Sequence, residues 1–471
     1  MPSRQDQLHS YQYSLQRVVA ALVTHDPDPH RSPLRRAGMT ALVSLLIAAV
    51  AVGGVAVYAL LTGASSGLPD NESAVYVEKG SGARFIYNKS ERKLHPVLNY
   101  SSALLIATGQ EPEVIRASRK QLAQVELGEP LGIPGAPDSL PDPDDLLTAP
   151  WSVCTQASSG TGSSAKPTST ALVGDVLTDG TIASSADEAL LVRDSQERIF
   201  LAYGNRRFPI PPAHSAATLS ALGWSAKQPW PVAAAWLNAV PLGPELTAPR
   251  ITDTGESSGV DDYRIGQVVT DAQAAGGKAT GWAVVLADGI APVTEMQATM
   301  LLAASGRDFV PIGARFGQLD RSATQLSDDG NANGMPRSVP TLADNPERAC
   351  MTLPVGKNAA GIRINPTVPT GTAVSGATVP GDVQADLVHV VRGRGAVVVS
   401  AASPSAPADA GTVTLVTDTG LRYAVASREA AAKLGYGGID LKQVPAELVA
   451  LLPQGPALDP ARARQSLPTA E

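Results

Sequence analysis

The chain has 471 residues and a mass of 48.5 kDa, which allows two or three domains of ordinary size. Its 43 glycines and 38 prolines exclude a coiled coil, and an apolar content of 44% argues against a chain that is disordered throughout. The net charge of −7 makes nucleic acid an unfavourable partner for most of the chain.

An uncharged stretch from Ala37 to Pro69 divides the chain. Within it, residues 41–61 are almost wholly aliphatic, and as a helix they would span about 31 Å, which matches the hydrocarbon core of a bilayer. We therefore predict a transmembrane helix over residues 39–62. The alternative is a cleaved secretory signal, but a signal core has only about 7–15 apolar residues after a short basic head.

Basic residues are concentrated directly before this segment. Arg31, Arg35 and Arg36 precede it, whereas the first basic residue after it is Lys79. The positive-inside rule therefore predicts a protein of the cell membrane that crosses once, with its N-terminus in the cytoplasm. The predicted parts on either side are a cytoplasmic head over residues 1–36 and an extracytoplasmic body over residues 70–471.

The cytoplasmic head is predicted to contain an amphipathic helix that ends near His25. Apolar residues recur there at steps of three and four, as on one face of a helix. This apolar stripe consists of Leu8, Tyr11, Leu15, Val18 and Leu22. It has no other core on its own side of the membrane, so we expect it to dock on a partner subunit or to lie along the inner membrane surface. The alternative is a helix that is only weakly ordered by itself.

The body is predicted to be α+β, with four small hairpin-helix repeat modules around a central β-rich core. The C-terminal module shows the pattern most clearly. Strands Val413–Thr417 and Leu421–Ala426 form a hairpin across a turn. Ser427 then caps a short helix, which Gly435 ends.

The same layout of hairpin, cap, helix and glycine occurs three more times. In the third module, Thr294 and Gln297 form a capping box before a helix that ends near Gly306. Uneven spacing between the modules excludes a solenoid or propeller with a fixed period, and chance recurrence of a common local pattern is the alternative. The modules are predicted at about residues 75–140, 186–250, 263–320 and 409–457.

The segments between modules are predicted to build the central core. They cover about residues 141–185 and 340–405. They include apolar stretches such as Leu387–Val391 and Gly395–Val399, which are typical of strands.

Each of these two segments contains one of the two cysteines of the chain, Cys154 and Cys350. An even number of cysteines in an oxidising compartment favours a disulfide, which would join the two segments into one core. The alternative is two buried free thiols. A metal site made by this pair would lack further ligands nearby.

Local motifs for phosphate or calcium binding are incomplete. The nearest approach to a phosphate-binding loop begins at Gly160, but Ala165 stands where a second glycine is needed and Pro167 where Ser or Thr would bind Mg²⁺. Residues 329–334 match the start of a calcium loop, but its twelfth position is Pro340 instead of Glu.

Signals of hydrolase chemistry are weaker still. The body contains only three histidines, His95, His214 and His389, and none stands near a nucleophile elbow or a zinc motif. The acidic stretch from Asp142 to Asp145 is typical of a solvated turn. We therefore predict no catalytic residue, no cofactor-binding residue and no metal site.

The two ends of the chain resemble one known family. The head reads YQYSLQRVVAALVTHDPDPHRSPLRR from Tyr11, and the tail reads VPAELVALLPQGPALDP from Val444. With one anchor, four outer modules and two distant cysteines, the chain is similar over nearly its whole length to EccB. That family is the membrane component of actinobacterial type VII (ESX) secretion systems.

The resemblance implies a structural subunit of an inner-membrane complex with the EccC ATPase, EccD and EccE, present in several copies. It also implies an outer domain of four modules around a central core. Members of the family are sometimes described as ATPases, and ATP enters only through that description. The alternative function is an extracytoplasmic nucleotide hydrolase or a cell-wall-directed enzyme, which a cluster of carboxylates or histidines assembled by the fold would favour.

Overall fold

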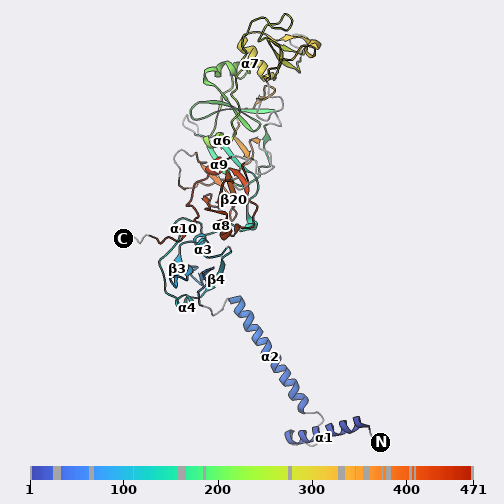
Figure 1. The fold of residues 1–471 in the computed structure, drawn as a ribbon, viewed down its shortest axis with the longest axis vertical. Helices are drawn as coiled ribbons and strands as arrows, with labels where there is room; N and C mark the ends of the chain where they lie inside the picture. The colour runs from blue at the N-terminus through green and yellow to red at the C-terminus, as the bar shows by residue number, and fades with distance from the viewer. Residues whose placement is uncertain are drawn as a thin grey trace. The chain divides into compact units, whose positions relative to one another are not determined.

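The computed structural model contains two compact units. Figure 1 colours the helices and strands from blue at the N-terminus to red at the C-terminus. The first unit contains Met1–Leu94 and Val114–Gly128, and the second unit contains His95–Glu113 and Glu129–Glu471. The structure describes residues 3–24, 33–62, 68–109, 111–157, 166–183, 187–273, 278–326, 335–344, 346–353, 361–373, 375–377, 383–402, 406–407 and 410–467.

The first unit begins with two long helices, α1 Arg4–Thr24 and α2 Pro33–Thr62. From Met39 to Tyr58, α2 has a mean hydropathy of 2.4, and none of this surface is buried. Among the described residues, no other helix is long and apolar enough to cross a membrane. The transmembrane helix predicted over residues 39–62 therefore lies within α2.

A small four-stranded sheet follows in the first unit, in the order β3-β2-β1-β4. Alternate residues of a strand point to the same face, so Ala74 and Tyr76 of β1 pack together with Leu94 of β3. Leu122 of the one-turn helix α4 covers this core. The elements are β1 Ala74–Glu78, β2 Arg84–Asn88, β3 Lys93–Val97, β4 Glu113–Ala117 and α4 Arg119–Leu122.

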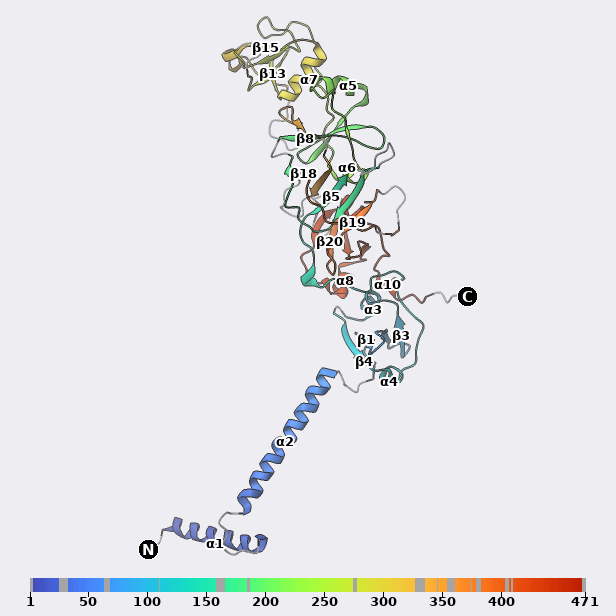
Figure 2. The same ribbon diagram turned by 180° about the vertical axis from the view of Figure 1, so that it is seen from behind.

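The second unit contains a six-stranded sheet in the order β19-β6-β5-β17-β18-β7. Figure 2 labels its strands β5, β18 and β19. Two chain segments build it, because three strands precede residue 185 and three follow residue 340. Its middle strands β5 and β17 are antiparallel and nearly all their side chains are buried, as in a strand that is covered on both faces. The strands are β5 Trp151–Gln156, β6 Thr168–Leu172, β7 Thr181–Ile182, β17 Arg348–Leu353, β18 Gly361–Ile364 and β19 Leu387–His389.

Three further small sheets in the second unit have the same strand order as the sheet of the first unit. In each, the strands lie in the order third, second, first, fourth, counted along the chain, and the fourth runs parallel to the first. The strands are β8 Glu188–Arg193, β9 Ile199–Tyr203, β10 Arg206–Ile210 and β11 Trp230–Pro231; β12 Val268–Thr270, β13 Trp282–Leu286, β14 Gly289–Val293 and β15 Val310–Pro311; β20 Ala396–Ala401, β21 Thr412–Val416, β22 Arg422–Ala424 and β23 Lys442–Pro445. A short extra strand, β16 Thr341–Leu342, also pairs with β8.

Along the chain, a helix follows the third strand and precedes the fourth strand of every small sheet. The helix of the third one starts at the predicted capping box, in which Gln297 N donates to Thr294 Oγ1 at 3.1 Å. Gly306 ends it with φ 61°, a left-handed conformation that glycine adopts at low cost. These helices are α3 Tyr100–Ile106, α5 Ser215–Ala221, α7 Glu295–Ser305 and α8 Arg428–Ala431, which continues as a π-helix over Ala432–Tyr436.

Short helices make up the remaining helical structure of the described residues. The α-helices are α6 Ala234–Ala239, α9 Ala446–Ala450 and α10 Pro460–Ala463, and the 3-10 turns are η1 Pro143–Asp145, η2 Pro212–His214 and η3 Gly313–Gly317. α6 carries Trp236, which is completely buried with Val153 of β5, Met351 of β17 and Leu448 of α9. One apolar cluster therefore joins the six-stranded sheet to two of the small sheets.

The third strand of each small sheet is covered by an extended segment that returns after the fourth strand. The bridges pair Leu94 with Leu127, Arg207 with Leu242, Ile290 with Arg321, and Arg422 with Gln454, all in the parallel sense. An uncovered edge strand would offer unpaired N–H and C=O groups to other chains. In each of the four small sheets, this segment therefore protects the edge formed by the third strand.

One predicted strand belongs to a different sheet. The sequence placed Gly395–Val399 in the central core, but β20 is the first strand of the fourth small sheet and pairs with β21 and β23. An apolar run indicates a strand but does not identify its hydrogen-bonding partners. Side chains of β20 such as Val398 nevertheless pack in the same apolar cluster as the six-stranded sheet.

Candidate membrane and partner-binding surfaces

The apolar stripe of α1 is exposed along its whole length. At 3.6 residues per turn, its five side chains lie within an arc of about 80°. Their exposed fractions are Leu8 55%, Tyr11 66%, Leu15 48%, Val18 59% and Leu22 74%. Ala20, on the opposite side of the helix, is only 2% exposed. The stripe therefore offers a narrow apolar surface that nothing in the described part of the chain covers.

The predicted orientation of α2 depends on three arginines before its apolar part. Arg31 lies outside the described residues, and the side chains of Arg35 and Arg36 lie outside them as well. The apolar side chains from Met39 to Tyr58 are all exposed, which suits contact with lipid chains. The structure thus supplies the length and surface of a span, and the orientation stays a prediction.

Cys154 and Cys350 form a disulfide between the two middle strands of the six-stranded sheet. They lie directly opposite each other on β5 and β17, and their sulfur atoms are 1.99 Å apart. Both residues are buried, and Leu172 of β6 and Leu177 pack against them. The bond closes a span of 196 residues and joins the two chain segments that build this sheet.

The C-terminal end of α3 is held by two basic residues from the other end of the chain. Lys433 Nζ donates to the carbonyl oxygen of Ala107 at 2.7 Å and to that of Leu105 at 3.4 Å. Arg464 Nη2 donates to the carbonyl oxygen of Ile106 at 3.2 Å. Cations suit this position because the last carbonyls of a helix carry partial negative charge. Burial lowers the pKa of Lys433, and the charge of Arg464 lowers it further.

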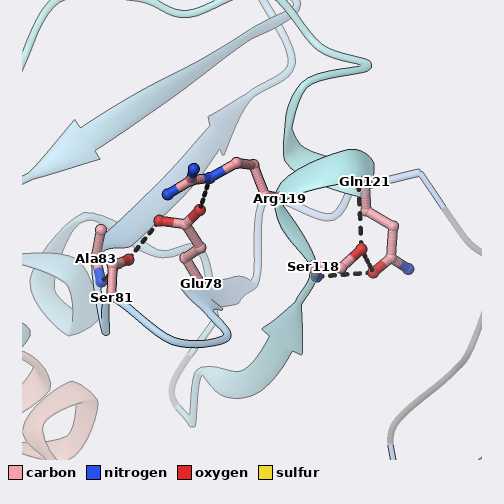
Figure 3. A network of polar contacts seen from close by, with 6 residues as sticks. All are labelled: Glu78, Ser81, Ala83, Ser118, Arg119 and Gln121. Carbon is pink, nitrogen blue, oxygen red and sulfur yellow. Dashed lines mark hydrogen bonds and ion pairs between the residues drawn. The ribbon is translucent and has the colours of Figure 1, made fainter.

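Glu78, at the end of β1, is bound by two side chains from neighbouring parts of the chain (Figure 3). Arg119 Nε lies 2.9 Å from Glu78 Oε1, and Ser81 Oγ donates to the other carboxylate oxygen. The hydrogen bonds from Ser81 and Arg119 lower the pKa of Glu78.

Carboxylates that follow the first strands of two other small sheets organise the turns after them. Asp194 accepts hydrogen bonds from Gln196 N at 2.8 Å, Arg198 N at 2.9 Å and Arg198 Nε at 2.7 Å. Burial raises the pKa of Asp194, but the hydrogen bonds from Arg198 and Gln196 outweigh burial and lower it. Asp271 similarly accepts from Thr280 N at 2.8 Å, and hydrogen bonds from Thr280 lower its pKa. These side chains are structural, and no motif in the sequence indicated them.

Most residues of the candidate phosphate and calcium loops lie outside the described residues. Gly160 and Ala165 lie outside the described residues, as do residues 329–334, whereas Lys166 is described and exposed. Among the described residues, no group of three or more His, Cys, Asp or Glu side chains could hold a metal ion.

The three histidines of the body lie in different elements and have ordinary surroundings. His95 Nδ1 lies 2.8 Å from the carbonyl oxygen of Glu129, and His214 is exposed. His389 Nδ1 lies 3.0 Å from the carbonyl oxygen of Thr370, and its Nε2 lies 3.8 Å from Asp175 Oδ2. The acidic turn predicted at Asp142–Asp145 forms η1 and is exposed. The fold therefore does not bring these candidates together.

Sequence comparisons link the whole chain to one group of proteins. A family model described as "Type VII secretion system ESX-1, transport TM domain B" matches residues 1–469. The Mycolicibacterium smegmatis protein named "ESX-3 secretion system ATPase EccB3" is 29% identical, over 96% of this chain and 88% of that protein. The Mycobacterium tuberculosis protein named "ESX-2 secretion system ATPase EccB2" is 27% identical, over 99% of this chain and 96% of that protein.

Two solved structures are similar along most of the chain. A chain of an intact ESX-5 inner-membrane complex has a TM-score of 0.70 and 26% sequence identity, and the match covers 100% of this chain and 96% of that one. A chain of the EccB3 dimer from the ESX-3 core complex has a TM-score of 0.66 and 25% sequence identity, with coverage of 83% and 100%. The likeness therefore extends from the helices of the first unit to the sheets of the second.

Proposed function

This chain belongs to the EccB family of type VII secretion systems, and on that basis we propose how it serves as a structural subunit of an inner-membrane protein secretion complex. The observation that carries the proposal is the match of the entire chain to a subunit of the ESX-5 inner-membrane complex. Because the match covers both the N-terminal helices and the body, we infer that each part serves in this chain as it does in that subunit. ATP hydrolysis, which the names of the relatives attribute to those proteins, forms no part of the proposal.

The first element of the proposal is the orientation. The N-terminal head faces the cytoplasm, α2 crosses the membrane once, and the body projects to the other side. Support comes from Arg31, Arg35 and Arg36 before the apolar segment and from the lack of a basic residue after it until Lys79.

The second element is the use of α1. We assign its apolar stripe to docking on partner subunits of the EccC, EccD and EccE type, or on the inner membrane surface. The exposed fractions of Leu15 and Leu22 support this assignment, because apolar surface gains free energy when it leaves water. We further propose that the assembly contains several copies of the chain.

The third element is the architecture of the body. We propose four repeat modules around a central core, at about residues 75–140, 186–250, 263–320 and 409–457, with the core from about 141–185 and 340–405. The common strand order of the four small sheets and the covering of each third strand support it. β20 begins at Ala396 and belongs to the sheet of the fourth module, so we move the boundary between the core and this module from residue 405 to just before Ala396.

The test is purification of the affinity-tagged full chain from its native membrane, followed by identification of the subunits that accompany it. We expect the other membrane subunits of a type VII system in constant ratio to the chain. Recovery of the chain without any of them would overturn the proposal. ATP turnover by the full chain, compared with a Lys166→Ala variant, tests the nucleotide-hydrolase alternative in the same preparation.

A further inference from the structure

The third small sheet borders a cleft with a volume of about 410 Å³. Strands β13 and β14, the start of α7, the turn η3 and the segment around Arg337 line this cleft, and all of them belong to the second unit. Its lining combines two aromatic residues, Trp282 and Phe316, with two cationic ones, Arg321 and Arg337. A cleft of this size, with apolar walls and a few charged groups, is typical of a ligand-binding site.

Backbone contacts fix the positions of both arginines. Arg321 forms a parallel bridge with Ile290 of β14. The carbonyl oxygen of Arg337 accepts a hydrogen bond at 3.3 Å from Met296 N in the first turn of α7. A cation whose backbone is already ordered loses less conformational entropy when it binds an anion.

The charge of these two arginines is not neutralised within the described part of the chain. Neither guanidinium group forms an ion pair or a hydrogen bond there, although Cζ of Arg321 lies 5.8 Å from the centre of the Phe316 ring. By contrast, Arg315 of η3 pairs with Asp261. The second unit contains 24 Lys and Arg against 36 Asp and Glu, so a surplus of basic residues does not explain two unpaired arginines in one cleft.

The aromatic walls of the cleft are fixed by their neighbours. Trp282 packs against Phe309 in a T-shaped arrangement, with ring centres 5.4 Å apart. Gly281 lies so close to Phe316 that a Cβ atom there would be 2.8 Å from Cε1 of the ring. Apolar surface therefore lies beside the charged groups, where the aliphatic part of a bound side chain can pack.

One acidic residue, Glu295 at the start of α7, also lines the cleft. Its carboxylate has no hydrogen-bond donor or ion-pair partner among the described residues. A complementary ligand therefore carries negative charge for the two arginines, an N–H donor for this carboxylate and an apolar part for the aromatic rings. An acidic peptide has all three features, whereas a free phosphate ion has only the first.

We propose that this cleft binds a short acidic peptide segment of a partner protein. Carboxylates of the peptide would pair with Arg321 and Arg337, whose planar guanidinium groups match a carboxylate through two parallel hydrogen bonds. A backbone N–H of the peptide would donate to Glu295, and its side-chain stems would pack on the two aromatic rings. The site depends only on the fold of the second unit, so the inference does not rest on the membrane crossing or on the proposed role in secretion.

Fluorescence anisotropy of the full chain in non-ionic detergent, with dye-labelled peptides, tests the proposal. The probes are peptides in which two Glu are separated by one, two or three residues of Gly or Leu, each matched by a counterpart with Gln in place of Glu. We expect an acidic peptide to bind about tenfold more tightly than its counterpart, because hydrogen bonds between charged groups are the stronger ones. Amides of residues 280–282 and 294–296 should exchange more slowly with solvent when it is bound.

Two variants should change the affinity in opposite directions. Arg321→Gln with Arg337→Gln should weaken binding of the acidic peptide about tenfold, since its carboxylates lose their partners. Glu295→Gln should strengthen binding several-fold, because repulsion between carboxylates is removed while an acceptor oxygen remains. The control, Arg250→Gln with Arg307→Gln, removes the same charge from exposed positions of the same unit and should leave the affinity nearly unchanged.

Three outcomes would overturn the proposal. They are equal binding of the acidic peptides and their Gln counterparts, equal effects of the cleft and control arginine variants, and displacement of the peptide by an equal concentration of inorganic phosphate. The last result would assign the cleft to small anions. If the double arginine variant does not fold, the Glu295→Gln variant decides, and an affinity that falls or stays the same there would also contradict the proposal.

Discussion

Lys433 binds the carbonyl oxygen of Ala107 across 326 residues of sequence. The contact closes the second unit, because it joins the helix α3 near its start to the π-helix near its end. Arg464 donates a further hydrogen bond at the same helix end, to the carbonyl oxygen of Ile106. The N-terminal segment of this unit is therefore held in place by the C-terminal part of the chain.

Loss of this contact should loosen α3. A Lys433→Met change keeps much of the apolar stem but leaves the carbonyl oxygen of Ala107 without its donor, which should cost about 1–3 kcal/mol in the free energy of unfolding. Thermal unfolding measures the loss, and hydrogen exchange of residues 100–109 should become faster. The control is Lys227→Met, which removes an exposed ion pair with Asp344 and should cost less than about 1 kcal/mol. Equal effects of the two changes would contradict the role of Lys433.

Removal of the disulfide should destabilise the second unit strongly. The bond between Cys154 and Cys350 closes a span of 196 residues, for which the chain-entropy model gives roughly 5 kcal/mol. Cys350→Ala and the double variant with Cys154→Ala should both unfold at a lower temperature than the parent. Non-reducing mass spectrometry of protein from the native envelope should show the two peptides linked, and free thiols there would refute the prediction.

The orientation can be measured by labelling single engineered cysteines in intact cells. A membrane-impermeant thiol reagent should reach Lys89→Cys, which lies in the exposed loop between β2 and β3. It should not reach Gln12→Cys on α1 until the cells are opened. The two native cysteines are bonded to each other and do not compete for the reagent. The reverse labelling pattern would show that the head faces outwards.

Charges placed on the apolar stripe should prevent docking of α1. Burial of a leucine side chain is worth roughly 1.5–3 kcal/mol, so Leu15→Asp with Leu22→Asp should remove several kcal/mol of binding free energy. The measurement is recovery of the assembled complex through an affinity tag on the variant. Gln12→Asp with Gln16→Asp introduces the same charge on another face of the helix and should leave recovery unchanged. Full recovery with the leucine variant would rule out the stripe as an assembly surface.

The stability of the second unit should fall in acid partly through Asp194. Its pKa in the folded chain lies below the ordinary value of 3.8, so the carboxylate stabilises the fold above that pH. This contribution is lost as the pH falls through the lowered pKa. Asp194→Asn should therefore cost about 1–3 kcal/mol at pH 7 and make the free energy of unfolding less dependent on pH between about 5 and 3.

Denaturant unfolding at several pH values checks this prediction. Asp262→Asn, at an exposed position of the same unit, serves as the control and should change neither quantity appreciably. A variant at Asp194 with the pH dependence of the parent would show that another group carries the acid sensitivity.

Some of the structure could be predicted because its causes are local. The capping box of Thr294 and Gln297 and the left-handed Gly306 lie within one helix, so their hydrogen bonds and dihedral angles follow from nearby residues. The hairpin predicted over Val413–Thr417 and Leu421–Ala426 corresponds to β21 and β22 for the same reason. Apart from β20, the first and fourth strands of the small sheets were not predicted, because loops or a helix separate them from the hairpin.

Other features depend on partners that no local pattern identifies. Gly395–Val399 was recognised as a strand but assigned to the wrong sheet, because its apolar run suits any buried strand. No sequence pattern indicated the hydrogen bonds of Asp194 either, since an Asp followed by polar residues is equally typical of a solvated turn. The family resemblance indicated the role of the chain without indicating these contacts.

The sequence by itself determined the anchor, the amphipathic head and the secretion family, since these depend on composition, on periodicity and on phrases that lie within single segments of the chain. Only the tertiary structure decided that Cys154 lies opposite Cys350, that Lys433 caps α3, and that Arg119 pairs with Glu78. The physical reason is that transfer of apolar residues from water and local hydrogen bonds act within a few residues. Strand register and long-range ion pairs form only when distant parts of the chain pack together in one arrangement.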